Sequence, residues 1–327
     1  MLRFFRSPKH ITIVVILLIG ILTWLQALDY PEKAVSGKYG TFIFNALSGW
    51  LTNMPEVQVA LGLVLFLLAA VLLIFVNARL HFIDKFSYVP VLCYVLLIGG
   101  APETHLLSPE LFATVILIAG FILLVGSFES EELSYSFFYV PAMISFATFF
   151  YQYMYVYMLV VWFIIAFWRP GYWREWVFSI LGFALPMFFA FSWFFLVDDD
   201  VTRIIDFFGE IFHIQRETLA LSQSSVVFFT FSIALTGATF WYALLYVGSK
   251  KTIVRTGYRI LILIAVLTTG MVFLVPDTFP QAWYILAFPL SLTISCYLAT
   301  ARSMRWATIV LGALLAGVVV GQVLAVN

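Results

Sequence analysis

The chain has 327 residues, of which 63% are hydrophobic, 19% are aromatic and only 10% are charged, and its formal net charge is zero. Soluble globular proteins carry about 25% charged residues, and disordered segments are rich in charge and poor in aromatics. The composition excludes both classes and predicts an all-α polytopic membrane protein, and the balanced charge gives no reason to expect a nucleic-acid partner.

Apolar runs near the length of a membrane-spanning helix recur along the whole sequence. Arg3, Arg6 and Lys9 precede the first run, which is long enough to span and lacks the small residue expected before a cleavage site. We therefore expect an uncleaved anchor. The eleven predicted spans are 11–28, 57–76, 86–101, 109–126, 135–150, 152–168, 175–196, 223–248, 258–275, 281–300 and 306–325. The third is short, and is either re-entrant or supported by its neighbours.

The stretch 135–168 is open to two interpretations. As one helix it would be about 51 Å long, against a hydrocarbon core of about 30 Å, so it is either one overlong helix or two spans that turn near Gln152. Lys and Arg near span ends favour the cytoplasm. If 135–168 forms two spans, every Lys and Arg lies in the cytoplasm except Lys33, Lys38, Arg203 and Arg216. If it forms one span, every later loop moves to the opposite side of the membrane, and most Lys and Arg residues then lie outside. The charges thus predict eleven spans, with the N-terminus cytoplasmic and the C-terminus outside.

Two predicted outer loops, 29–56 and 197–221, are too long to be simple turns. In the first, Phe44, Leu47 and Leu51 recur at helical spacing, which is typical of an amphipathic helix at the membrane interface. The second has the same pattern, and its apolar side comprises Ile204, Ile205, Phe207, Phe208, Ile211 and Phe212. We found no internal repeat, so residues 1–327 are expected to form a single integral membrane domain.

Most of the acidic residues fall on the predicted outer side. This excess is either a sign of function there or a means of keeping short loops soluble, because acids contribute little to orientation. The outer acids are Asp29, Glu32, Glu56, Glu103, Glu110, Asp198, Asp199, Asp200, Asp206, Glu210, Glu217 and Asp277.

Motifs of soluble enzymes are missing from the sequence, including phosphate loops, dinucleotide-binding glycines and the H-E-x-x-H metal motif. The four histidines are scattered, so no metal site is predicted, and Cys93 and Cys296 lie in apolar runs as small hydrophobic residues. Centres of the predicted spans carry no charged residue, which argues against an ion-coupled transporter. Aromatics are densest in 135–157, where they either line a groove for a sugar or isoprenoid chain or face lipid.

Asp29 directly follows the first span, in the sequence Asp29-Tyr30-Pro31-Glu32-Lys33. An outward carboxylate there can act as a general base or bind a metal, while nearby Lys and Arg can hold a phosphate. The alternative is an ordinary polar loop with a proline turn.

The long first outer loop that begins with an acid, the interfacial helices and the cytoplasmic N-terminus resemble the GT-C class of polyprenyl-linked glycosyltransferases, over about residues 1–220. In that class an acid of the first outer loop is the catalytic base or helps to bind a metal. The resemblance implies this role for Asp29, with assistance from Glu32, and it allows a divalent cation as cofactor. Phosphate-binding residues would then be Lys33, Lys38, Arg203 and Arg216.

A second resemblance rests on Arg169-Pro170-Gly171-Tyr172-Trp173-Arg174-Glu175-Trp176. This R-P-x-x-W-R-E-W turn is similar to that of an uncharacterised family of bacterial polytopic inner-membrane proteins, which implies a location in the bacterial inner membrane. Physically, the turn reads as a cytoplasmic loop with an aromatic belt, more typical of anchoring than of catalysis.

The sequence therefore predicts a GT-C-like protein that acts at the outer leaflet on a polyprenyl-phosphate-linked or other lipid-linked substrate, with glycosyl transfer in envelope biogenesis as its reaction. One alternative is a non-enzymatic subunit or scaffold that binds another membrane protein in an envelope-assembly or secretion complex. A transporter of lipids or small molecules is the weaker alternative.

Overall fold

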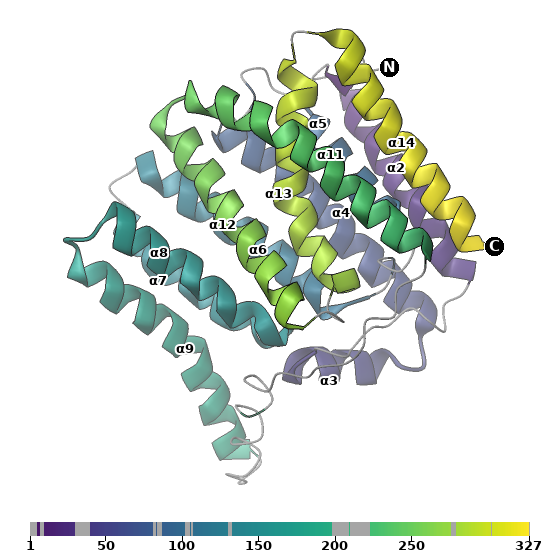
Figure 1. The fold of residues 1–327 in the computed structure, drawn as a ribbon. Helices are drawn as coiled ribbons and strands as arrows, with labels where there is room; N and C mark the ends of the chain where they lie inside the picture. The colour runs from purple at the N-terminus through teal and green to yellow at the C-terminus, as the bar shows by residue number, and fades with distance from the viewer. Residues whose placement is uncertain are drawn as a thin grey trace.

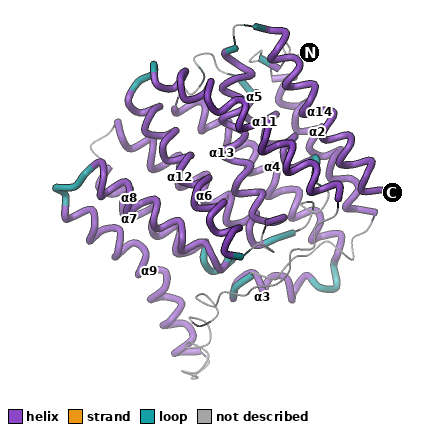
Figure 2. Tube along the Cα trace, in the orientation of Figure 1, coloured by secondary structure: helices purple, strands orange, loops and turns teal. Residues whose placement is uncertain are grey.

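The computed structural model describes residues 5–6, 10–29, 40–80, 83, 87–101, 105, 107–129, 133–197, 209, 223–275, 279–301 and 303–326. These residues form a bundle of α-helices with no strand among them, apart from one isolated bridge between Gly40 and Tyr151 (Figures 1 and 2). In chain order the α-helices are α2 (His10–Asp29), α3 (Phe42–Leu51), α4 (Pro55–Leu80), α5 (Val89–Gly99), α6 (Pro109–Gly126), α7 (Leu133–Ala147), α8 (Met158–Trp168), α9 (Trp173–Val197), α11 (Gln223–Gly248), α12 (Thr252–Leu274), α13 (Phe279–Thr300) and α14 (Met304–Val326). Two 3-10 helices, η3 (Ser127–Glu129) and η4 (Gln152–Tyr157), accompany them.

Each of the eleven predicted spans falls on one of these helices, with η4 and α8 together covering 152–168. Within the described ranges, seven helices are long and apolar enough to cross a membrane, which agrees with a membrane-embedded protein. They lie in Pro55–Ala78, Pro109–Gly126, Trp173–Trp193, Val226–Gly248, Thr252–Leu274, Ala282–Thr300 and Met304–Val323.

The chain folds back between α7 and α8, so the single overlong helix is excluded. Phe128, which lies just before α7, packs edge-on against Trp168 at the end of α8, with ring centroids 6.2 Å apart. α9 then returns along α7, and the two helices approach so closely that a Cβ at Gly182 would collide with the carbonyl oxygen of Phe138. Glycine at this position is therefore required for the contact.

α5 and α13 form the centre of the bundle. Every residue of α5 is buried, and the indole Nε1 of Trp283 in α13 donates a hydrogen bond to the carbonyl oxygen of Leu97, at 2.8 Å. α5 is about 16 Å long at 1.5 Å per residue, roughly half of a hydrocarbon core. Pro90 at its start and Gly99-Gly100 at its end limit its length.

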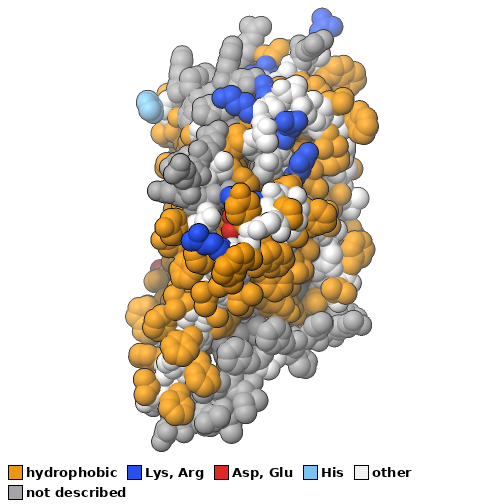
Figure 3. Space-filling model, turned by 90° about the vertical axis from the view of Figure 1, so that its left-hand side faces the viewer, with side chains coloured by type: hydrophobic (Ala, Val, Ile, Leu, Met, Phe, Trp, Pro, Cys, Tyr) orange, Lys and Arg blue, Asp and Glu red, His pale blue; other side chains and the backbone are white. Residues whose placement is uncertain are grey.

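The described basic side chains gather at one end of the bundle, which we call the cation end. The turns α8–α9, α11–α12 and α13–α14 meet there: Phe128 contacts Trp168 and also lines a pocket with Lys251, and Arg6 donates to the carbonyl oxygen of Leu298 at 2.9 Å. Figure 3 shows Lys and Arg side chains over the upper and middle part of a face of the molecule. The described basic residues whose side chains are placed are Arg6, Arg169, Arg174, Lys250, Lys251, Arg255, Arg259 and Arg305.

The opposite end, which we call the α3 end, carries the first predicted interfacial helix. α3 lies across this end in Figure 1, and of the predicted apolar face it buries Phe44 and Leu51 in the bundle, with Leu47 partly buried. The second predicted interfacial helix, within 197–221, falls outside the described residues except for Val197 and Gly209.

Candidate functional site

The structure describes only one of the residues proposed for catalysis or phosphate binding. Asp29 is the last residue of α2, as predicted for an acid at the end of the first span. Five others lie outside the described residues: Glu32, Lys33, Lys38, Arg203 and Arg216. Their convergence on Asp29 stays a prediction.

Backbone hydrogen bonds fix the start of α3 to the turn after α7. The amides of Thr41 and Ile43 donate to the carbonyl oxygens of Phe150 and Phe149, at 3.1 and 3.0 Å, and the Thr41 hydroxyl donates to that of Thr148 at 2.6 Å. These bonds give hydrogen-bond partners to three backbone carbonyl groups of the turn, which have no partner within α7 because the helix has ended. The 40–43 segment and the 148–151 turn therefore form one rigid unit.

Gly40 allows the chain to enter this unit. A Cβ at Gly40 would overlap the ring of Phe44, which is fully buried and packs edge-on against Phe112 of α6, with centroids 6.1 Å apart. The glycine therefore lets α3 bury its anchoring ring while the backbone passes directly over it.

An apolar groove of about 370 Å³ opens between α3, α7 and α9. Phe42 and Ile43 form one wall, and Phe146 and Phe149 of the aromatic-rich segment form the floor. The remaining wall comes from α9, through Leu185, Pro186, Phe189, Ala190 and Trp193. The size falls within the range of small-molecule pockets, but the lining carries almost no polar atom, so the groove suits a hydrocarbon chain.

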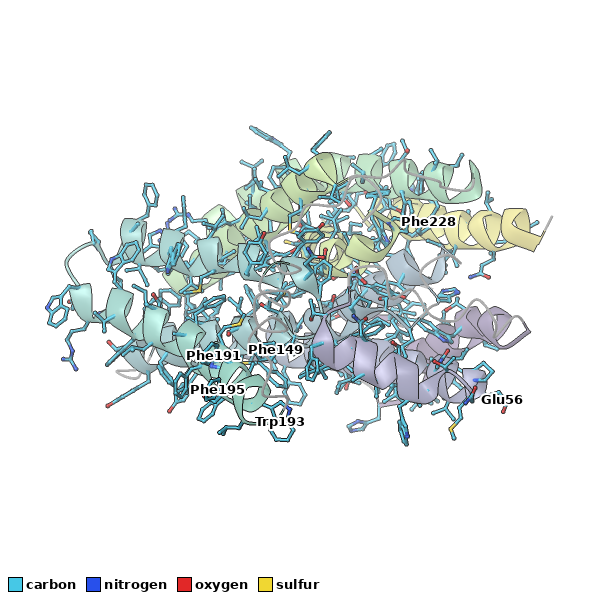
Figure 4. The ribbon with its side chains drawn as sticks, turned by 90° about the horizontal axis from the view of Figure 1, so that it is seen from below. Glu56, Phe149, Phe191, Trp193, Phe195 and Phe228 are labelled. Carbon is cyan, nitrogen blue, oxygen red and sulfur yellow. The ribbon has the colours of Figure 1, made fainter. Side chains whose placement is uncertain are left out.

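The α9 wall of this groove belongs to an exposed row of aromatic side chains. In Figure 4 Phe149 lies beside the α9 side chains Phe191, Trp193 and Phe195. Trp193 is 59% exposed, and the rings of Phe191 and Phe195 stack with centroids 6.4 Å apart. Glu56, which is exposed, lies on the far side of the bundle end from these aromatics in the same view.

A group of buried polar side chains lies beside Trp24 of α2. Trp24, about 7 Å before Asp29 along α2, packs against the ring of His105 with centroids 4.9 Å apart. His105 is 2% exposed, and both Ser108 and Glu110 are fully buried at the start of α6. Among the described residues, neither the Ser108 hydroxyl nor the carboxyl oxygens of Glu110 have a hydrogen-bond partner.

Burial lowers the pKa of His105 to about 4, although the nearby carbonyl of Ile98 opposes this shift. His105 is consequently a neutral imidazole at neutral pH.

The R-P-x-x-W-R-E-W turn builds an ion pair at the cation end. Nε of Arg169 lies 3.0 Å from Oε1 of Glu175, and the guanidinium stacks over Tyr172 at 4.2 Å from the ring centroid. Glu175 is buried, and the Ser134 hydroxyl of α7 also reaches its carboxylate, at 3.5 Å. The motif therefore joins α7, α8 and α9 through one carboxylate. Anchoring at the membrane interface by its aromatic residues stays a prediction.

Metal-binding groups do not assemble in the described part of the chain, where no three His, Cys, Asp or Glu residues come together. Cys93 and Cys296 are both buried, and neither forms a disulfide within the described residues, in agreement with their prediction as small hydrophobic residues.

Comparison with known proteins gives no relative: no family model, no curated protein and no solved structure matches this chain. Both family resemblances therefore stay predictions.

Sequence reasoning missed two features of this region. It placed Glu110 and His105 in outer loops or at a boundary, whereas the structure buries both. It also gave no means of joining Phe42, Phe149 and Leu185, which are distant in sequence and meet in the groove. The only available signal was the aromatic density of 135–157.

Proposed function

We propose that this protein binds a polyprenyl-phosphate-linked or other lipid-linked substrate at the α3 end of the bundle, in the outer leaflet of a bacterial inner membrane. The observation that carries the proposal is the apolar groove between α3, α7 and α9. In this proposal the isoprenoid chain lies in the groove, and its phosphate faces the loop between Asp29 and Gly40.

The location of the groove supports this assignment. Its walls include Phe42 and Ile43, and the preceding residues 40–41 are bound to the α7 turn, so the groove and the loop that carries Glu32, Lys33 and Lys38 adjoin in the chain. A lipid whose chain lies in the groove would bring its phosphate headgroup toward basic side chains that can bind a phosphate. Lys33, Lys38, Arg203 and Arg216 would bind the phosphate, by charge-assisted hydrogen bonds.

Glycosyl transfer is the reaction we propose for this site. Asp29 would act as the base that accepts a proton from the attacking hydroxyl, or as a ligand to a divalent cation, and Glu32 would assist it. The fixed cations would stabilise the departing polyprenyl phosphate, which leaves with the electron pair of the bond to the sugar.

The test measures lipid binding by native mass spectrometry of the purified protein in mild detergent, with a polyprenyl phosphate as probe. Ala190→Trp fills the groove and is expected to lower binding by about tenfold or more, because the chain then loses buried apolar contact. Ala184→Trp is the matched control, since Ala184 is exposed on α9 and does not line the groove. Asp29→Asn is expected to leave binding unchanged and to remove transfer of the sugar from a polyprenyl-phosphate sugar.

Equal binding by the two tryptophan variants would contradict the groove assignment. Unchanged transfer by the Asp29→Asn variant would remove Asp29 from catalysis. A stoichiometric protein partner with only bulk phospholipid would instead favour the non-enzymatic subunit.

A further inference from the structure

α12 carries three basic residues on one face at the cation end. Lys251 precedes the helix, and Arg255 and Arg259 follow at intervals of four residues, so the three side chains project from the same side. All three are exposed. The guanidinium of Arg255 donates to the hydroxyl of Thr252 at 3.2 Å, which orients it along the helix surface.

These three cations have no acidic partner among the described residues. Arg169 and Glu175 do form an ion pair at this end, on the α8–α9 turn, but it involves none of the three α12 cations. Basic residues at a span end are common on the cytoplasmic side, so exposure alone is no argument for a site. What distinguishes these three residues from ordinary cytoplasmic cations is the apolar surface that continues along the same face of α12.

A second groove, of about 460 Å³, lies directly along this face between α11, α12 and α13. Ile262, Val266 and Phe273 line it from α12, and they follow Arg255 and Arg259 at intervals that keep them on one side of a helix with 3.6 residues per turn. Phe240 of α11 and Leu290 of α13 form the other walls. The cationic patch and the groove thus form one continuous surface.

The groove is open at its side and closed at its floor. Val266 is 59% exposed and Phe273 is 81% exposed, so the α12 wall faces the surroundings of the bundle. Beneath them, the hydroxyls of Tyr258 and Thr293 share a hydrogen bond at 3.3 Å, which joins α12 to α13. The α12 residues that line the groove, from Tyr258 to Phe273, extend for about 22 Å, more than half of a hydrocarbon core of about 30 Å, so an acyl chain of one leaflet fits along it.

We propose that this surface binds an anionic phospholipid, whose phosphate lies on Lys251, Arg255 and Arg259 and whose acyl chain fills the groove between α11, α12 and α13. Charge complementarity selects this occupant, because exposed cations with no acidic partner among the described residues stand at one end of an apolar groove that is long enough for an acyl chain. The site is at the cation end, opposite to the proposed substrate groove, and it does not rest on the proposed function.

The experiment measures binding of phosphatidylglycerol, with phosphatidylcholine as the neutral competitor, by native mass spectrometry of the whole protein in mild detergent. The Arg255→Gln/Arg259→Gln variant is expected to lower the affinity for phosphatidylglycerol by roughly ten- to thirtyfold. Its matched control is Arg174→Gln/Arg305→Gln, which removes the same charge from exposed positions of the cation end outside the groove. The control is expected to bind as the unmodified protein does.

A third variant tests the groove without a change in charge. Val266→Trp fills the exposed wall and is expected to lower phosphatidylglycerol binding severalfold, while Val319→Trp, on the exposed face of α14, leaves it unchanged. An equal loss of phosphatidylglycerol affinity in the two double variants would overturn the proposal. The lipid would then be attracted by the total positive charge of the cation end and not by Arg255 and Arg259 in particular. No loss with Val266→Trp would overturn it as well, since the chain would lie elsewhere.

Discussion

The protonation state of His105 is determined by its surroundings in the folded protein. The sequence puts this histidine in a loop, yet the structure buries it against Trp24. Transfer of a charged imidazole out of water is costly, so the folded protein keeps it neutral. The unfolded chain has no such constraint, and a proton therefore favours unfolding.

The pH dependence of stability follows from this difference. The pKa of His105 is about 4 in the folded protein and about 6.5, the ordinary value of histidine, in the unfolded chain, so the unfolded state binds more protons between these limits. The stabilisation is complete above about pH 6.5 and falls by about 3 kcal/mol as the pH drops toward 4. We expect thermal unfolding in detergent to show this loss, and a His105→Asn variant to lack it.

Parallel unfolding profiles for the His105→Asn variant and the unmodified protein between pH 7 and 4 would contradict the assignment.

At the scale of elements, the turn 168–176 joins three helices through one buried carboxylate. Glu175 accepts from Arg169 and from Ser134, and its side chain is 1% exposed. A buried charge that loses its partner costs more than the pair contributes, because its desolvation is then uncompensated.

We expect Arg169→Leu to lower the free energy of unfolding by about 2 kcal/mol, since it removes the cation and leaves the carboxylate. The Arg169→Leu/Glu175→Leu double variant should recover part of this loss, because no unpaired charge remains. Chemical denaturation in detergent, arranged as a double-mutant cycle, measures the coupling. Additive effects of the two substitutions would mean that the ion pair does not link the helices.

Helices were predictable from the sequence, and their packing was not. Apolar runs bounded by Pro55, Pro109 or Gly248 are local patterns, and each became a helix close to the predicted limits. α3 was likewise predicted as an amphipathic helix with Phe44, Leu47 and Leu51 on its apolar face, although its packing of Phe44 against α6 was not predicted. The apolar groove forms where α7 and α9 contact α3. A single sequence does not show which distant segments come into contact, so this groove could not be predicted from it.

For the whole molecule, the separation of charge predicts its orientation. The described basic side chains lie at the cation end, and α3 lies at the other. Because Lys and Arg near span ends remain in the cytoplasm, we propose that the cation end faces the cytoplasm. The candidate groove at the α3 end would then face outward.

Cysteine labelling in intact cells checks this orientation. Gly171 and Gly49 lie at opposite ends, and a Cβ at either position meets no neighbour within 4 Å, so Gly171→Cys and Gly49→Cys are structurally tolerated. We expect a membrane-impermeant maleimide to label Gly49→Cys in sealed cells and Gly171→Cys only after the membrane is opened. Cys93 and Cys296 are buried and give little background. The reverse pattern would invert the topology and place the groove in the cytoplasmic leaflet.

The short central helix α5 has a consequence for how the protein is made. With an apolar stretch of about half the bilayer thickness, α5 lacks the length for stable insertion by itself. Its hydrogen bond from Trp283 and its packing against α13 come from a part of the chain that is synthesised much later. During synthesis α5 therefore remains incompletely packed until α13, in the C-terminal half of the chain, has been synthesised and inserted.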